Sequence, residues 1–197
     1  MKKSIVINRQ YGSGGRVIGQ KVAEQLHMPY FDSNILSEAA QDHGIDVEKL
    51  KDFDEKLMGS LLYNIAAMTT LDEKARALPY DMYRAISDTI YNTAMKEPTV
   101  FVGRCADQVL KEHGLNYLNV FVYASDMEER KRRAINVDGV EENYAEAYIY
   151  KKDRARAKYQ KFFTNTEFGK FMEYDVCLNS SALGYDKCAD MIVSAVR

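Results

Sequence analysis

The first part of the chain constrains the fold most strongly. Residues 4–7 form a short, mostly apolar run rich in β-branched side chains, and a glycine-rich turn at residues 12–15 follows. Between residues 16 and 27, apolar residues recur at helical spacing. This pattern predicts a strand, a glycine loop and a helix. Glycines let backbone N–H groups approach an anion closely, and a helix start adds unpaired N–H groups and a positive dipole end. The stretch therefore predicts a phosphate cradle.

The glycine loop departs from the usual phosphate-binding motif. In G-x-x-x-x-G-K-[ST], the last glycine is followed by a lysine and by the hydroxyl that holds Mg²⁺. Here Gly14 is followed by Gly15 and Arg16, so both of these groups are missing. The alternative interpretation is a tight turn between strand and helix that binds no ligand.

A short second strand is predicted to end at Asp32 and Ser33. Ligands of open α/β sheets bind outside the carboxyl ends of the strands, so these side chains should lie beside the glycine loop. Capping of the following helix is an equally simple role for either residue.

The remaining pattern predicts the fold class. Residues 37–96 are expected to be helical, with Pro79 among the points that punctuate them. Apolar strands are expected at residues 99–102, 119–123 and 176–178, each followed by a helix. Strands that alternate with helices predict an α/β fold, with a parallel sheet covered on both faces.

Composition narrows the function classes. The net charge of −2 argues against attraction to nucleic acid or to a membrane surface. The three cysteines form no C-x-x-C pair, which suits a reducing compartment. We find no apolar leader, no run of membrane-spanning length and no spacing typical of a metal-ligand set, so a cytoplasmic protein without a metal centre of its own is expected.

One segment is strongly basic in this slightly acidic chain. Residues 151–161 contain six lysines and arginines and one acid, Asp153. The segment predicts a local anion site, although a solvated helix face is the more common role of such a run. Nucleic acid is a weaker alternative because no nucleic-acid motif accompanies it.

Several segments along the chain resemble the cytidylate kinase-like family, a branch of the P-loop nucleoside monophosphate kinases. They are residues 9–16 with 18–19, 30–33, 102–107, 121–125 with Arg130 and Arg133, Lys152, Asp153 and Arg156, and 174–181. The resemblance covers most of the chain and is weakest between residues 38 and 98. It implies a three-layer P-loop kinase-like fold with about five parallel strands. It also implies a single domain over 1–197, with a core at 1–36 and 99–197, a helical insertion at 37–98 and a basic helical lid at 141–170.

The resemblance further implies ATP-dependent phosphoryl transfer to a nucleotide or similar small acceptor, first of all a nucleoside monophosphate such as CMP, with Mg²⁺. ATP would be held by Arg9, Gly12, Ser13, Gly14, Gly15, Arg16 and Val17. The acceptor would be bound by Ser33, Arg104 and Asp107. The family's Gly-Arg-Asp triplet is Gly103-Arg104-Cys105 here, and Asp107 stands two positions further on. Catalysis would fall to Asp32, Arg16 and two lid arginines, Arg154 and Arg156.

The variant loop leaves open which group replaces the missing lysine. Under the kinase interpretation, either Arg9 or Arg16 supplies its charge, and Asp32 organises Mg²⁺ or the acceptor.

Two other functions remain as alternatives to a kinase. A nucleotide- or phosphate-binding module without transferase activity is the second candidate function. A dinucleotide-dependent oxidoreductase is the third, although Val17 stands where its third glycine would be. The helices rich in methionine and tyrosine between residues 57 and 91 suggest a homodimer face.

Overall fold

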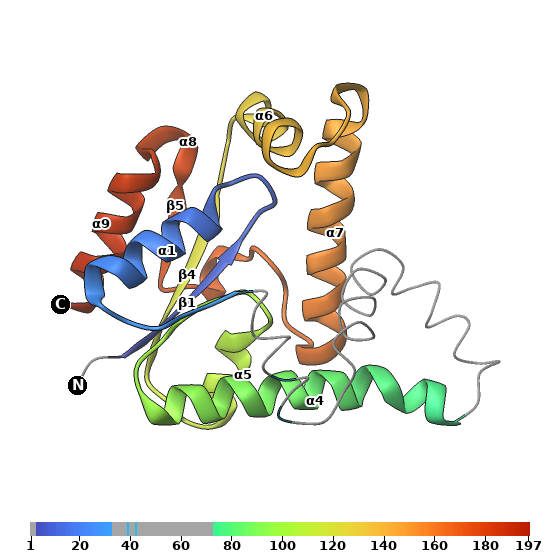
Figure 1. Ribbon diagram of the computed structural model, residues 1–197, viewed down its shortest axis with the longest axis vertical. Coiled ribbons are helices and arrows are strands. Elements are labelled where there is room, and N and C mark those ends of the chain that lie inside the picture. The colour runs from blue at the N-terminus through green and yellow to red at the C-terminus, as the bar shows by residue number, and fades with distance from the viewer. Residues whose placement is uncertain (1–2, 33–38, 40–41, 43–72) are drawn as a thin grey trace.

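Five parallel strands form one sheet at the centre of the molecule (Figure 1). The structure is a computed structural model that describes residues 3–32, 39, 42 and 73–197. The strand order is β2-β3-β1-β4-β5. The strands are β1 (Ser4–Arg9), β2 (Tyr30–Phe31), β3 (Val100–Val102), β4 (Tyr117–Tyr123) and β5 (Val176–Asn179).

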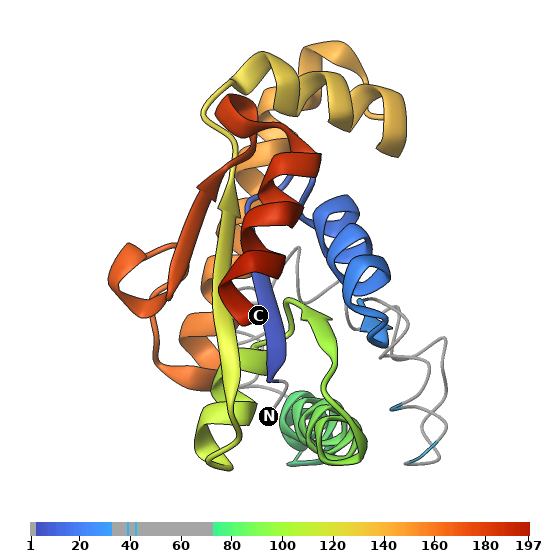
Figure 2. The same cartoon turned by 90° about the vertical axis from the view of Figure 1, so that its left-hand side faces the viewer.

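Helices cover both faces of this sheet. Two of them, α1 and α9, pack on one face, and α4 and α5 pack on the other. In Figure 2, α9 lies across β1 and β4. The helices are α1 (Gly15–Leu26), α4 (Glu73–Lys96), α5 (Ala106–Glu112), α6 (Met127–Asp138), α7 (Ala145–Thr164), α8 (Ser180–Leu183) and α9 (Tyr185–Val196), with single 3₁₀ turns η1 (Glu142–Tyr144) and η2 (Phe171–Glu173).

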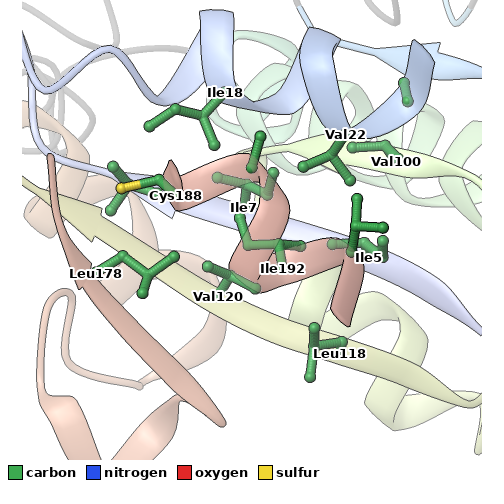
Figure 3. Packing of buried hydrophobic residues seen from close by; sticks show 14 of the residues in the cluster. Ile5, Ile7, Ile18, Val22, Val100, Leu118, Val120, Leu178, Cys188 and Ile192 are labelled. Atoms are coloured by element: carbon green, nitrogen blue, oxygen red, sulfur yellow. The ribbon is translucent and has the colours of Figure 1, made fainter. Parts of the chain in front are cut away.

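The central strand β1 is buried on both faces, as its apolar sequence predicts. Its side chains alternate between two cores. Ile5 and Ile7 point toward α1 and α9, where they meet Ile18 and Ile192 (Figure 3). Val6 points the other way, into the core formed with α4 and α5. The position of β1 between two hydrophobic layers fixes the start of the glycine loop.

The strand order reverses at β1. This strand pairs with β3 on one side and with β4 on the other. The chain leaves β1 toward β2 at one edge of the sheet and later crosses back to β4 and β5. Ligands in open parallel sheets bind at such a switch point, outside the carboxyl ends of the strands. This is the edge at which β1 ends with Arg9 and β3 ends before Gly103.

The predicted fold class is confirmed, and the elements differ from expectation in detail. The α4 helix continues through Pro79, where an interruption was expected. The fourth strand begins at Tyr117, two residues earlier than the pattern suggested. Much of the predicted helical insertion lies outside the described residues, including residues 57–72 of the methionine- and tyrosine-rich helices that suggested a homodimer face. No helix in the described part of the chain is both long and apolar enough to cross a membrane.

Candidate functional site

The glycine loop between β1 and α1 requires its glycines. Gly12 and Gly14 both have a φ near +80°, a conformation that side chains with a Cβ rarely adopt. A Cβ on Gly14 would lie 2.4 Å from the ring of Tyr185, and a Cβ on Gly12 would lie 3.0 Å from the carbonyl oxygen of Arg130. Any other residue at Gly14 would therefore strain the backbone of the loop and push the ring of Tyr185 aside.

The α1 helix begins directly after this loop. Its N-cap is Gly14, which carries no side chain to pair with the first N–H groups of the helix. Gly14, Gly15 and Arg16 also line a cavity. The start of α1 thus presents backbone donors and the positive end of a twelve-residue helix to that cavity.

The cavity has a volume of about 400 Å³ and is strongly cationic. The ends of β1 and β3, the last turn of α6 and one face of α7 form its walls. Among the described residues, its charged lining comprises Arg9, Arg16, Arg104, Arg133, Lys152, Arg156 and a single carboxylate, Asp138. That carboxylate accepts a hydrogen bond from the hydroxyl of Tyr11. Such a surplus of positive charge suits a ligand with several phosphate groups.

Side chains from α6 and α7 hold the glycine loop in place. Arg130 donates from Nε to the carbonyl oxygen of Tyr11 at 2.7 Å, and it forms an ion pair with Asp153. Asp153 in turn accepts from the backbone N–H of Tyr11 at 2.7 Å. Arg156 donates from Nη1 to the carbonyl oxygen of Arg9 at 2.8 Å. The basic segment predicted from sequence is therefore attached directly to the loop.

Asp32 lies between two arginines at the end of β2. Its Oδ2 is 2.5 Å from Nε of Arg16, and its Oδ1 is 3.5 Å from Nη2 of Arg9. Burial, and next the charge of Arg156, lower the pKa of the Arg9 guanidinium to about 9. Burial likewise lowers the pKa of Arg156 to about 10. These two largely buried cations would be stabilised by a bound anion.

Of the residues predicted to bind the acceptor, Arg104 lines the cavity and Asp107 does not. Arg104 has a φ of 62°, so its backbone is left-handed directly after Gly103. Asp107 is buried in the first turn of α5. Its carboxylate accepts from Nδ2 of Asn8 at 3.3 Å and from Nε2 of Gln108 at 2.8 Å. Ser33 lies outside the described residues.

Some residues predicted to bind ATP or catalyse transfer also lie away from the cavity lining. The Ser13 hydroxyl is turned back onto the loop, where it donates to the carbonyl oxygen of Gln10 at 2.9 Å. Val17 follows on α1 and is absent from the lining. Arg154 is exposed, because it stands two residues from Arg156 and thus about 200° around α7. Arg9, Gly12, Gly14, Gly15, Arg16 and Arg156 do meet at the cavity.

Sequence reasoning missed the aromatic side of the cavity. Tyr148, Lys152 and Arg156 line it from one face of α7. Tyr148 meets Tyr11 edge to face at 5.5 Å, and the ammonium of Lys152 lies 5.1 Å from the centre of the Tyr148 ring. Residues four apart on a helix share a face, so the spacing 148, 152, 156 was the signal that could have found this stripe.

The site fits phosphate groups better than it fits a metal ion. The glycine loop, the start of α1 and the arginines offer donors for phosphate oxygens. No group of three or more histidine, cysteine, aspartate or glutamate side chains suited to a metal occurs among the described residues. Both oxygens of Asp32 face arginines, and Arg16 occupies the motif position of the Mg²⁺-binding hydroxyl.

Comparison with known proteins gives a family and a fold. A sequence model of the cytidylate kinase-like family matches residues 4–182. No curated protein matches the chain. An uncharacterized protein from Eubacterium ventriosum ATCC 27560 has a similar structure, with 24% identity, 99% of this chain and 98% of that chain covered, and a TM-score of 0.74.

Two kinases share the fold at lower identity. Shikimate kinase from Bacteroides thetaiotaomicron is 14% identical, with 99% of this chain and 98% of that chain covered and a TM-score of 0.59. A gluconokinase from Sinorhizobium meliloti 1021 is also 14% identical, with 99% and 91% covered and a TM-score of 0.53. At these identities the likeness establishes the P-loop kinase fold alone.

Proposed function

Because the chain belongs to the cytidylate kinase-like family, we propose that it transfers a phosphoryl group from ATP to a small acceptor. A nucleoside monophosphate such as CMP is the first candidate for that acceptor. The observation that carries the proposal is the cavity, in which six cationic side chains surround a glycine loop and the start of a helix. Phosphoryl transfer needs positioning and positive charge rather than covalent chemistry from the protein, and this cavity supplies both.

The geometry suggests a division of roles within the cavity. The backbone of residues 12–16 and the start of α1 would hold the phosphates of ATP. Arg104, at the end of β3, would hold the phosphate of the acceptor. Arg156 and Lys152 reach the cavity from α7, inside the segment predicted as a lid, and would cover the transferring group and exclude water.

Kinases of this fold generally use ATP and Mg²⁺. The described residues fit the nucleotide phosphates, and they provide Mg²⁺ with no free carboxylate at the loop. We therefore propose no ligand for the metal among the described side chains. For Asp32 we propose a positioning role, in which its carboxylate orients the guanidinium groups of Arg9 and Arg16.

The altered glycine loop and the pairing of Asp32 with arginines favour a second candidate function. A chain with Gly15 and Arg16 at the motif positions of the lysine and the hydroxyl, and with Asp32 engaged by arginines, would bind nucleotides without transferring a phosphoryl group. Because the family is kinase-like, we rank phosphoryl transfer first and the binding module second. The dinucleotide-dependent oxidoreductase ranks third.

A coupled assay of ADP release tests the proposal. The chain is incubated with ATP and Mg²⁺ and with CMP, dCMP, UMP, AMP, GMP or the nucleosides, and then with shikimate or gluconate as acceptors of the neighbouring kinases. We expect release that depends on a nucleoside monophosphate and that falls at least tenfold in Arg104→Gln. Arg132→Gln, at an exposed position outside the cavity, is the matched control. Calorimetric binding of ATP without release for any acceptor would favour the binding module instead.

A further inference from the structure

Two residues that flank the glycine loop, the last of β1 and the first of α1, have exchanged side chains relative to the usual motif. When the second glycine of G-x-x-x-x-G-K-[ST] is set on Gly14, the first glycine falls on Arg9 and the lysine falls on Gly15. A cation therefore stands where the motif has a glycine, and a glycine stands where it has the cation.

The side chain of Arg9 passes directly over Gly15. A Cβ added to Gly15 would lie 2.6 Å from Cβ and 2.8 Å from Cγ of Arg9, below the 3.0 Å that real Cβ contacts respect. The stem of Arg9 thus occupies the space into which a side chain at position 15 would begin. A lysine at position 15 and an arginine at position 9 exclude each other.

The guanidinium of Arg9 occupies space that a second glycine leaves open. A Cβ added to Gly103, after β3, would lie 1.9 Å from Nη1 of Arg9. The guanidinium therefore reaches the end of β3 across the floor of the cavity, which both residues line. Its Nε is buried and has no hydrogen-bond partner among the described residues. A buried donor without a partner is costly, so this N–H is available to an oxygen of a ligand.

The other candidate for the missing charge is Arg16. Its side chain is 54% exposed and its Nε is bound to Asp32 at 2.5 Å. The side chain of Arg9 is 14% exposed, and Asp32 is 3.5 Å away from its Nη2. Arg9 is therefore the more deeply buried cation and the one more weakly held by the carboxylate.

We propose that Arg9, which reaches across Gly15 from the end of β1, takes the place of the phosphate-binding lysine. It would bind the terminal phosphates of a nucleoside di- or triphosphate, and so the inference rests on the proposed function and deepens it. The cation enters the cradle from the strand side of the loop instead of from the first turn of α1. Arg16 keeps an outer position, paired with Asp32.

The test is a reciprocal exchange of the two side chains. Calorimetric titrations with ADP and with inorganic pyrophosphate compare the native chain with Arg9→Met, Gly15→Lys and the double variant Arg9→Gly/Gly15→Lys. Arg9→Met keeps the stem and removes the charge, so it should fold and should bind at least tenfold more weakly. Gly15→Lys alone should also bind weakly, because its stem collides with Arg9. In the double variant the lysine enters the vacated space, and affinity should rise at least fivefold above that of Arg9→Met.

Each outcome separates this inference from the proposed function. Native affinity in Arg9→Met, together with a tenfold loss in Arg16→Gln, would assign the phosphate to Arg16 and overturn the inference while the proposed function stands. A native chain that binds neither ADP nor pyrophosphate overturns both. Weak binding in Arg9→Met with recovery in the double variant supports the inference, because a merely structural role of Arg9 would not be rescued by a lysine at position 15.

Discussion

The side chain of Arg156 both supports the glycine loop and lines the cavity. Its Nη1 supports the carbonyl oxygen of Arg9, its guanidinium lies 5.6 Å from the centre of the Tyr11 ring, and it lines the cavity. Arg156→Gln should weaken ADP binding about tenfold or more, because a charged hydrogen-bond donor and the support of the loop are lost together. Titration calorimetry measures the effect. Arg132→Gln removes an equal charge from an exposed site on α6, and an equal loss there would refute a local role of Arg156.

The lowered pKa of Arg9 predicts how binding depends on pH. Burial and the charge of Arg156 lower this pKa to about 9 in the free chain, and a bound phosphate raises it again. The charged form binds the anion, so affinity should fall as pH rises above about 9, by up to tenfold per pH unit for one coupled proton.

Titration of ADP into the native chain between pH 7.5 and 10 checks this dependence, with pH values that lie above the titration of the ligand's own phosphate. In Arg9→Met the decline should be shallower, because the coupled group is gone. An equally steep decline in that variant would show that another group, such as Arg156, titrates instead.

Among the elements, α6 and α7 clamp the glycine loop through one ion pair. The side chains of Arg130 and Asp153 are 5% and 20% exposed, and both bind the backbone of Tyr11. Arg130→Met removes a buried cation and leaves the half-buried carboxylate of Asp153 without its partner, which should lower the free energy of unfolding by about 3 kcal/mol. Urea denaturation measures the change.

Arg132→Met is the matched control for this substitution, because Arg132 is the exposed neighbour on the same helix. Its effect should stay within about 0.5 kcal/mol. A loss below about 1 kcal/mol for Arg130→Met would mean that the loop keeps its position without the clamp.

The sequence predicted the parts of this structure that depend on local pattern. The apolar run of β1, the glycine loop and α1 follow from periodicity and from glycine chemistry, and the parallel sheet follows from the alternation of strands and helices. The path of Arg9 could not be predicted, because it depends on Gly103, which is distant in the chain and adjacent in the sheet. The burial of Asp107 also depends on a distant partner, Asn8. Helical spacing on α7 could have predicted that Arg156 shares a face with Tyr148 and Lys152, whereas Arg154 does not.

For the whole molecule, an anion in the cavity should stabilise the fold. Ligand that binds the folded chain alone, at about 100 times its Kd, adds about 2.7 kcal/mol. For a chain of this length that corresponds to a rise in Tm of about 5–10 °C. Thermal unfolding with and without ADP or pyrophosphate checks this. Arg9→Met should show a much smaller rise at the same ligand concentration, and a full native rise would contradict a central role for that cation.

The route of Arg9 between two glycines also has a consequence for how chains of this kind can diverge. A side chain at position 15 collides with the Cβ and Cγ of Arg9, so it becomes tolerable only once residue 9 is glycine. A side chain at position 103 also collides with Arg9, but it is strained by the φ of +79° whatever residue stands at position 9. Loss of the arginine must therefore come before the gain of a lysine at position 15, or the two changes must arise together. Positions 9 and 15 are expected to covary among relatives, with glycine at 15 inherited alongside arginine at 9, whereas the backbone keeps glycine at 103 in either case.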